Sequence, residues 1–526
     1  MSIEKINRMT SNETITYEGG KAYRLSFIEQ LAEFFCLGLL NGNFYQSEEE
    51  VLQNARELYE RAMAECPEFA TKAAIYGNNF NSLKLVPTIW LVYLSTLDDK
   101  TLFKKAFPRI IRNPKMLYDF MEIARKSNIR TGLGRSVKKT MNEWLLNHLN
   151  EYQASRNKGK LAEIIKVTRP SFQDETFQNY MKYIAKNELT FDRAIALKEV
   201  IQSLQSGRYT EEDSQKVFAY RLQLEELKHS IGALSADDKK RLYYDMYNGL
   251  NYAALILNLV ALERVYATKT EKVRKYSSER GYYDYTQIIE TVIPDEVLDM
   301  VSKRIKDIDM YRKSNMLPFA LLNAEKMVAT PEFKSAIADV FKIAANEAFN
   351  ISKDNSVFVA VDTSASMSGT HVTEHLTCAD IACLFGSMIK KAYHPANVVA
   401  VATSCQPVNL VAQEDIFTMS RKIAQTDVGF GTYFEKIMKY YNGEKYVILI
   451  TDSEQADNLE GRWLKEQKRP KGSKLIVWQL QPYRIKISQD PSVVYIRGYS
   501  DRNLGLIKQI IESDGDQIAE IEKIEL

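Results

Sequence analysis

This 526-residue sequence has few cysteines and no long apolar segment. Its five cysteines, Cys36, Cys66, Cys378, Cys383 and Cys405, form no CxxC pair, so neither a disulfide framework nor a thiolate metal site is indicated. No apolar run approaches the roughly 20 residues of a membrane span. The first 24 residues lack the apolar core of a signal peptide. We therefore expect a cytoplasmic protein that does not contact membranes.

The sequence also lacks the common motifs of enzymes. It contains no P-loop, no HExxH and no recognisable pairing of a nucleophile with a base. Two of its five histidines, His371 and His375, are spaced as neighbours on a helix, and a solvated helix face explains them better than a metal pair. We therefore expect no enzymatic activity.

One stretch in the C-terminal third combines a buried strand with oxygen ligands. A valine-rich run over residues 356–361 ends at Asp362 and is followed by Ser364, Ser366 and Gly369. Such a run predicts a buried parallel strand, with the polar residues in the loop at its carboxyl end. Ligands of open α/β sheets bind at that edge. A carboxylate and two hydroxyls suit Mg²⁺ better than zinc.

Two later stretches extend this pattern. Thr432 follows a glycine-containing loop, and a second apolar run over residues 446–450 ends at Thr451 and Asp452. The three elements, in this order, resemble the metal-ion-dependent adhesion site of von Willebrand factor A domains. The resemblance implies one Mg²⁺ or similar divalent cation with an open position for a partner's carboxylate. Its ligands, some acting through water, would be Asp362, Ser364, Ser366, Thr432 and Asp452. The alternative is a loop whose serines only cap the next helix.

The chain changes its pattern near residues 350–355. After an extended leader over residues 1–25, apolar residues recur at helical spacing, for example over residues 48–66, 113–126, 134–152 and 239–267, with no convincing strand. Beyond residue 352, predicted strands at 357–362, 398–403, 446–452, 475–480 and 493–496 alternate with helices. We expect a multidomain protein: an all-α, HEAT-like solenoid over residues 1–352 and a doubly wound α/β domain over residues 353–526. An irregular all-α domain is the alternative for the first part.

Positive charge is concentrated in one part of the helical region. The net charge is only +2, but residues 101–169 contain sixteen Lys or Arg against five Asp or Glu. Such an excess predicts a surface that binds the phosphates of a polyanion, whereas a solvated face is the alternative. No recognition helix or RNP1 sheet is present, so sequence-specific DNA binding is not indicated. The candidate RNA-binding residues are Arg130, Arg135, Lys138, Lys139, Arg156, Lys158, Lys160, Lys166 and Arg169.

Taken together, the helical repeats, the basic stretch and the adhesion-type loop resemble the Ro ribonucleoprotein family, which combines a TROVE module with a von Willebrand factor A domain. The resemblance covers nearly the whole chain. Its more specific pieces are Gly132-Leu-Gly134-Arg135, Met316-Leu-Pro318-Phe319, Asp362-Thr-Ser364-Ala-Ser366-Met367 and Thr451-Asp452-Ser453-Glu454.

The resemblance implies a function as well as a fold. The helical repeats would close into a ring whose hole takes single-stranded 3′ ends of misfolded RNA. The outer basic surface would bind structured, Y RNA-like noncoding RNA. Arg156 and Arg169 match RNA-contacting positions, whereas Tyr152 stands where the family has a lysine and could stack on an unpaired base. The protein would be a scaffold in RNA quality control, with an RNA-processing nuclease or another protein ligand as a further partner. The alternative is a metal-dependent protein-adhesion or chaperone-like scaffold without RNA.

Overall fold

The computed structural model describes residues 12–277, 282–314, 316–352, 354–411 and 413–526, and over residues 268–291 it describes the backbone only. By contacts between residues, the chain forms two compact units. Unit 1 comprises Met1–Ile110, Leu317–Phe319 and Phe341–Leu526, and unit 2 comprises Ile111–Met316 and Ala320–Val340. These units are defined by contacts and not by the type of element, so the predicted domain boundary at residue 352 stays a prediction.

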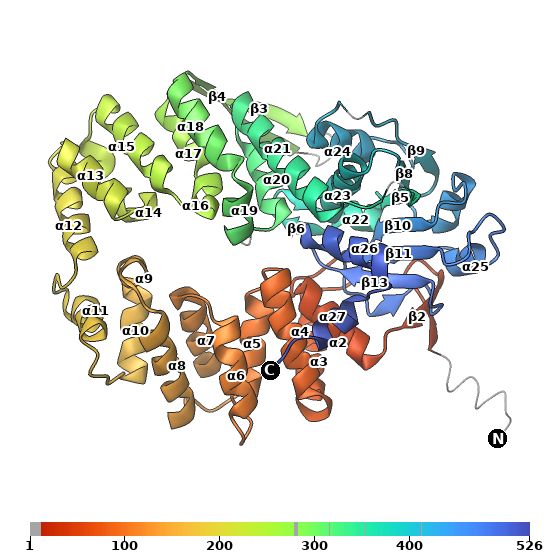
Figure 1. Ribbon diagram of the computed structural model, residues 1–526, viewed down its shortest axis with the longest axis horizontal. Helices are drawn as coiled ribbons and strands as arrows, with labels where there is room; N and C mark the ends of the chain where they lie inside the picture. Colours follow the sequence, from red (N-terminus) through yellow and green to blue (C-terminus); the bar gives the residue numbers. More distant parts are fainter. Residues whose placement is uncertain (1–11, 278–281, 315, 353, 412) are drawn as a thin grey trace. The chain divides into compact units, whose positions relative to one another are not determined.

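A six-stranded sheet forms the centre of the C-terminal part of unit 1 (Figure 1). Its order is β13-β11-β10-β5-β8-β9, and every neighbouring pair is parallel except β8 and β9. All residues of β5 and β10 are buried, as expected for a parallel sheet covered on both faces. The predicted doubly wound sheet is confirmed. Its strands are β5 (Val357–Asp362), β8 (Asn397–Val401), β9 (Cys405–Pro407), β10 (Tyr446–Thr451), β11 (Lys474–Gln479) and β13 (Val493–Arg497).

Helices pack against both faces of this sheet. On one face, α23 contacts β5, β8 and β10, and Phe385 of α23 stacks on Trp478 with ring centroids 4.1 Å apart. The other face contributes to an apolar cluster that includes Tyr441 and Trp463. The remaining elements of this part are α22 (Ala365–Gly369), β6 (His371–Thr373), β7 (Leu376–Thr377), α23 (Cys378–Ala392), α24 (Ile416–Ala424), η2 (Phe434–Lys439), α25 (Leu459–Leu464), β12 (Ile485–Lys486), α26 (Arg502–Ser513) and α27 (Gln517–Glu522). His371 and His375 are exposed in or beside the β6–β7 hairpin, so their assignment to a helix was wrong.

The N-terminal residues complete unit 1. Strand β2 pairs with β1 on one side and with β12 on the other, so part of the predicted leader forms a separate three-stranded sheet with a strand of the C-terminal part. In the helices that follow, the α2–α4 contact is so close that a Cβ on Gly77 would lie 1.8 Å from the carbonyl oxygen of Phe35. Residues 1–11 of the predicted leader lie outside the described residues. The N-terminal elements are β1 (Glu13–Ile15), β2 (Lys21–Arg24), α2 (Phe27–Leu37), α3 (Glu48–Glu65), α4 (Pro67–Phe80), α5 (Leu85–Leu94) and α6 (Thr101–Ile110).

Unit 2 is mostly helical, and its helices contact others that are near in sequence, such as α7 with α10, α9 with α12 and α13 with α15. This pattern is typical of an α-solenoid. Its helices are α7 (Pro114–Lys126), α8 (Arg135–His148), α9 (Glu151–Arg156), α10 (Lys158–Thr168), α11 (Glu175–Lys186), α12 (Asp192–Gln205), α13 (Glu211–Ala219), α14 (Leu224–Leu227), η1 (Ile231–Ala233), α15 (Ala236–Gly249), α16 (Tyr252–Leu257), α17 (Leu259–Val265), α18 (Asp295–Ile305) and α19 (Ile308–Ser314). Helices α20 (Pro318–Met327) and α21 (Pro331–Ala348) have residues in both units.

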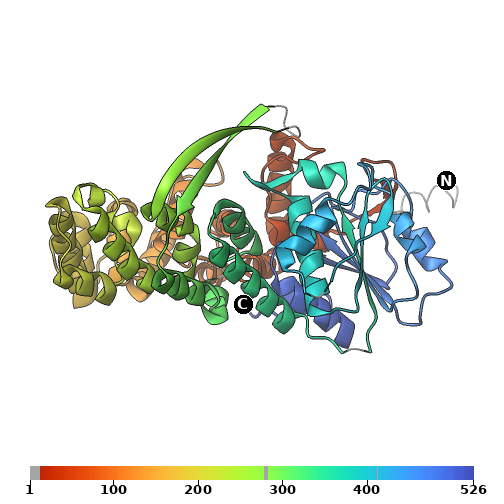
Figure 2. The ribbon, with the colours of Figure 1, turned by 90° about the horizontal axis from the view of Figure 1, so that it is seen from above.

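Two predictions within unit 2 were wrong. The single helix expected over residues 239–267 is three helices, because the side chain of Asn251 caps α16 and that of Asn258 bonds the carbonyl of Ala254. Immediately afterwards, β3 (Ala267–Ser277) and β4 (Tyr282–Thr291) form a long antiparallel hairpin where no strand was expected (Figure 2). Threonine, tyrosine, valine and isoleucine are frequent in this segment and favour strands.

Among the described residues, no helix has both the length and the hydropathy needed to cross a bilayer.

Candidate functional site

Two neighbouring strands bring the predicted metal ligands to one edge of the sheet. Strand β5 ends at Asp362 and the parallel strand β10 ends at Thr451, directly before Asp452. The side chains of Asp362, Ser364, Thr432 and Asp452 are at most 1% exposed, and that of Ser366 is 2% exposed. Five polar side chains are therefore withdrawn from water at the carboxyl edge of the sheet.

Hydrogen bonds hold the first of these loops. Asp362 accepts the backbone N–H of Ser364 (2.9 Å) through Oδ1 and the hydroxyl of Thr451 (2.7 Å) through Oδ2. The hydroxyls of Ser364 and Ser366 are 3.2 Å apart. The loop is thus fixed with its oxygens gathered beside the carboxylate.

Asp452 has fewer hydrogen bonds than Asp362. Its Oδ1 accepts the N–H of Glu454 (3.0 Å), and the nearby side chain of Ser366 opposes part of the rise in its pKa. Its Oδ2 is buried and has no hydrogen-bond partner. The next residue, Ser453, adopts a φ of 72°, a left-handed conformation that is uncommon for serine and tends to occur at functional sites. The orphaned oxygen marks a position for a ligand that the protein itself does not supply.

Thr432 lies between the two acidic loops. Its carbonyl accepts the N–H of Ala456 (2.6 Å), and the carbonyl of Phe430, two residues earlier, accepts the N–H of Ala365 (2.9 Å). The structure therefore brings all three predicted loops to the same place.

The electrostatics of this edge favour a cation. Burial, followed by the negative charge of Asp452, raises the pKa of Asp362, and burial likewise raises the pKa of Asp452. Among the described residues no Lys or Arg forms an ion pair with either carboxylate, and no group of three or more His, Cys, Asp or Glu side chains has the arrangement of a metal site. Two carboxylates beside several hydroxyls are a donor set that fits Mg²⁺, which takes oxygen ligands and retains water.

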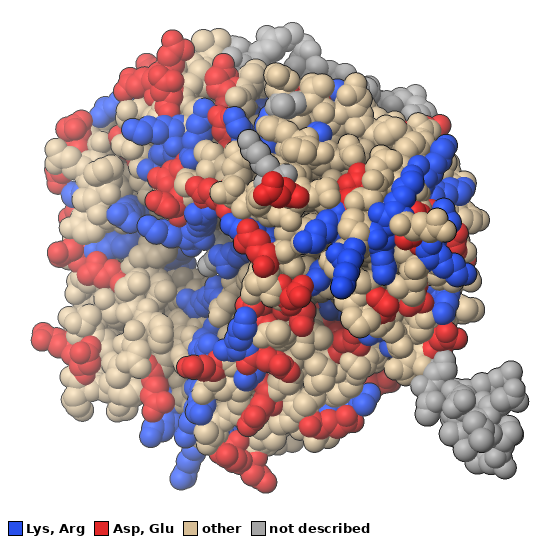
Figure 3. Space-filling view, turned by 45° about the vertical axis from the view of Figure 1, so that its right-hand side comes forward, with Lys and Arg blue, Asp and Glu red and all other residues tan. Residues whose placement is uncertain are grey.

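The predicted RNA-binding residues lie on or beside three consecutive helices of unit 2. The face drawn in Figure 3 has interspersed basic and acidic side chains. For the predicted RNA-binding residues, the contacts of the described side chains show which cations have local partners. Lys139 is 3.8 Å from Glu143. Arg130 donates to the carbonyl of Gly132 (2.6 Å), and Lys158 lies 3.8 Å from the ring centroid of Tyr183. The side chains without an ion pair or hydrogen bond among the described residues are those of Arg135, Lys138, Lys160, Lys166 and Arg169.

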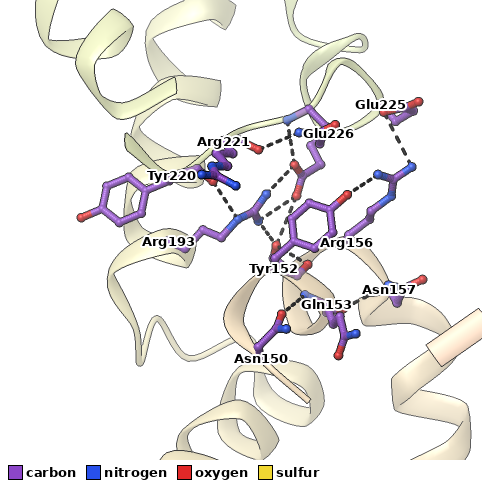
Figure 4. Close-up of polar contacts among 12 residues, drawn as sticks. Asn150, Tyr152, Gln153, Arg156, Asn157, Arg193, Tyr220, Arg221, Glu225 and Glu226 are labelled. Carbon is purple, nitrogen blue, oxygen red and sulfur yellow. Dashed lines mark hydrogen bonds and ion pairs between the residues drawn. The ribbon is translucent and has the colours of Figure 1, made fainter. Parts of the chain in front are cut away.

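Arg156 belongs to a second group of contacts (Figure 4). Its guanidinium bonds the hydroxyl of Tyr152 and lies 4.0 Å from the carboxylate of Glu225. Beside it, the buried Arg193 forms a bidentate pair with Glu226, at 2.9 and 2.7 Å, and its guanidinium lies 5.1 Å from the ring centroid of Tyr152. The ion pairs of Arg156 with Glu225 and of Arg193 with Glu226 thereby connect α9 and α12 to α14, and both arginines contact Tyr152.

Tyr152 and Arg193 line a cavity of about 1210 Å³ within unit 2. Arg304, also in the lining, donates to the carbonyls of Asn248 and Leu250, while its Nε is buried without a partner. Burial lowers the pKa of Arg304, with Arg221 as a further, like-charged cause. Arg221 and Lys313 are exposed in the lining and form no ion pair with any described carboxylate. The cavity therefore presents cations whose charge is not neutralised locally.

Aromatic side chains share this cavity. Tyr152 and Tyr220 are partly exposed and Phe218 is 57% exposed, while Tyr180 and Tyr252 are buried in the wall. None of these residues except Tyr152 was singled out in the sequence. Arg221 lies in the turn after α13, Arg304 on α18 and Lys313 on α19. All three are outside the basic stretch, so the charge of that stretch could not have identified them.

Comparisons with known proteins identify the fold. A scan against protein-family models finds no match, and a search of curated proteins by sequence finds none. A search of solved structures finds the crystal structure of the Ro (RSR) protein of Deinococcus radiodurans with a TM-score of 0.61. The alignment has 16% identity and covers 93% of this chain and 100% of that one. The resemblance inferred from the motifs is thereby confirmed at the level of the fold.

Proposed function

Because this chain shares the fold of a Ro protein, we propose that it is a noncatalytic RNA-binding protein that acts as a ribonucleoprotein scaffold in RNA quality control. Unit 2 binds noncoding RNA, and the adhesion-type site of unit 1 binds Mg²⁺. The structured part of a Y RNA-like molecule contacts the basic helices α8 and α10. A single-stranded 3′ end of a misfolded RNA enters the cavity lined by Tyr152.

The cavity is the observation that carries this proposal. Arg221 and Lys313 present charge to phosphates, and Phe218 and Tyr220 present aromatic faces to bases. Bases reach such faces only when they are unpaired, so the combination favours a single strand over a duplex. At about 1210 Å³, the cavity is larger than the roughly 300–1,000 Å³ of a typical small-molecule site and has room for more than one nucleotide.

The metal site gives the protein a second binding function. Asp362, Ser364, Ser366, Thr432 and Asp452 would hold the ion, directly or through water. When bound, Mg²⁺ offers a coordination position to an external oxygen ligand, such as the carboxylate of a protein partner.

Removing the two unpaired cations of the cavity is expected to weaken the binding of single-stranded RNA. In Arg221→Ala with Lys313→Ala, the slope of log K against log salt should fall by about 1.4, because each phosphate contact of a single strand contributes about 0.7. Counterion release alone then predicts about 25-fold weaker binding at 0.1 M salt. Filter binding of a short oligonucleotide over a salt series measures both quantities.

A matched control removes the same charge elsewhere in unit 2. Lys115 and Lys126 lie on α7 and are engaged by Asp119 and Glu122 of the same helix. The variant Lys115→Ala with Lys126→Ala should bind the oligonucleotide almost as the native protein does. Equal losses in the two double variants would show that total charge matters and the cavity does not.

The outer cations are expected to affect structured RNA instead. Arg135→Ala with Lys138→Ala should lower the salt slope for a stem-loop RNA by about 1.8, at about 0.9 for each contact with a duplex. Binding of the short single strand should change much less. Equal losses for every RNA in this variant and in the cavity variant would contradict two separate sites. Native affinity in both would favour the alternative of a metal-dependent protein-binding scaffold without RNA.

A further inference from the structure

A turn near the N-terminus lies against the loop that follows Asp452. Within this turn, residues 16–20, the hydroxyl of Thr16 donates to the carbonyl of Gln455 (2.5 Å), and the N–H of Gly20 donates to the same carbonyl (3.1 Å). A Cβ on Gly20 would lie 2.2 Å from that oxygen, so the close approach requires glycine. The N–H of Tyr17 donates to a carboxylate oxygen of Glu454 (2.6 Å). Backbone contacts therefore fix the turn beside the metal ligands.

Tyr45 connects this turn to the loop that follows Asp362. The hydroxyl of Tyr45 donates to the carboxylate of Glu18 (2.5 Å), and it lies close enough to the side chain of Ser366 for that hydroxyl to influence the pKa of Tyr45. The rings of Tyr17 and Tyr45 are stacked, with centroids 4.9 Å apart and an interplanar angle of 4°. Tyr45 thus links Glu18 to a predicted ligand of the ion.

The carboxylates gathered here have no local counter-charge. The carboxylate of Glu454 accepts the N–H of Tyr17, the residue before Glu18, so two carboxylates come together where this turn contacts the loop after Asp452. Lys21, the nearest lysine along this segment, is engaged by Glu13 (3.0 Å) and Glu460 (3.4 Å). Among the described residues, no Lys or Arg forms an ion pair with Glu18, Glu454 or either predicted aspartate ligand. Grouped carboxylates of this kind are costly unless a cation lies among them.

We propose that Glu18 is the external carboxylate of the metal site, so that the chain itself completes the coordination of its ion. The inference rests on the Mg²⁺ binding proposed above and adds a ligand from a part of the chain that the adhesion-type motif does not include. Glu18 is exposed on a turn, whereas Asp362 and Asp452 are buried. Glu18 can therefore move onto the ion while the buried ligands stay in place. A protein partner that offers its own carboxylate has to displace Glu18 first.

The test compares two equal substitutions on the same segment. Glu18→Gln keeps the size of the side chain but removes its charge, and Glu13→Gln does the same five residues earlier. Isothermal titration of the full chain with MgCl₂ should give at least fivefold weaker binding for Glu18→Gln and a change of less than twofold for Glu13→Gln. Hydrogen exchange supplies an independent measurement: Mg²⁺ should slow exchange of the amides of residues 17–20 in the native protein but not in Glu18→Gln.

Each outcome is decisive. If the native protein binds Mg²⁺ and Glu18→Gln binds it equally well with the same protection, Glu18 is not a ligand, although the metal site stands. If the native protein does not bind Mg²⁺, the metal site and this inference both fail. If both variants weaken binding equally, the effect comes from the general charge of the segment, and the assignment of Glu18 is wrong.

Discussion

Replacing Asp362 by alanine is expected to abolish Mg²⁺ binding. The substitution removes one of two buried carboxylates, and the hydroxyls together with Asp452 alone are too weak a donor set for a divalent cation. At a Mg²⁺ concentration of 100 times the dissociation constant, the ion should stabilise the native protein by about 2.7 kcal/mol, and this gain should vanish in the variant. Calorimetry and thermal unfolding with and without Mg²⁺ measure the two effects.

The same substitution should be tolerated without the metal. It leaves the N–H of Ser364 and the hydroxyl of Thr451 without their acceptor, but it also removes the repulsion between Asp362 and Asp452. Ser368→Ala is the control, because Ser368 is exposed and close in sequence to the predicted ligands. Native Mg²⁺ affinity in Asp362→Ala would contradict the metal site.

Neutralising Glu226 is expected to destabilise unit 2 strongly. The side chains of Arg193 and Glu226 are 3% and 7% exposed, so Glu226→Gln leaves a buried guanidinium without a counter-charge. Breaking a buried pair in this way costs about 3–5 kcal/mol. Because Arg193 also bonds Ser155 and contacts the ring of Tyr152, the cavity should lose its shape as well. Urea unfolding followed by circular dichroism measures the loss of stability.

The neighbouring residue provides a matched control. Glu225 is 42% exposed and lies 4.0 Å from Arg156, so Glu225→Gln removes the same charge from a solvated pair. Exposed pairs of this kind contribute about 0–1 kcal/mol. Equal unfolding midpoints for the two variants would show that the pair of Arg193 and Glu226 is not important for the stability of this unit.

The C-terminal sheet was predictable because its signals are local. Strands β5 and β10 are apolar runs that end at polar residues, and parallel strands covered on both faces need such runs. The ends of two neighbouring strands then placed Asp362 and Asp452 at one edge. The orphaned Oδ2 of Asp452 could not be foreseen, because it depends on which groups the folded loops leave out.

The parts that sequence reasoning missed depend on contacts distant in the chain. Strand β2 is short, and its pairing with β12 joins Tyr23 to Lys486. Glu18 carries no motif and gains its place only through Tyr45 and the loop after Asp452. The cavity cations are similar: Arg221 and Arg304 lie in segments of mixed charge that are distant in the chain, and only the fold brings them together. The helix breaks within residues 239–267 are different, because they come from local contacts of Asn251 and Asn258 that apolar periodicity does not reveal.

Unit 1 combines residues from both ends of the chain, and this affects the order in which the two units can fold during translation. Thr16 and Gln455, which are hydrogen-bonded, are 439 residues apart in the chain. At about 5–20 residues per second, translation needs roughly 20–90 s to cover that distance. During this time the surfaces of α2 and α4 that later contact α27 have no partner, whereas every residue of unit 2 has been made once Val340 is added. The residues of unit 2 can therefore fold before unit 1 is complete, while the apolar surfaces of α2 and α4 that contact α27 stay exposed until the C-terminal residues have been made.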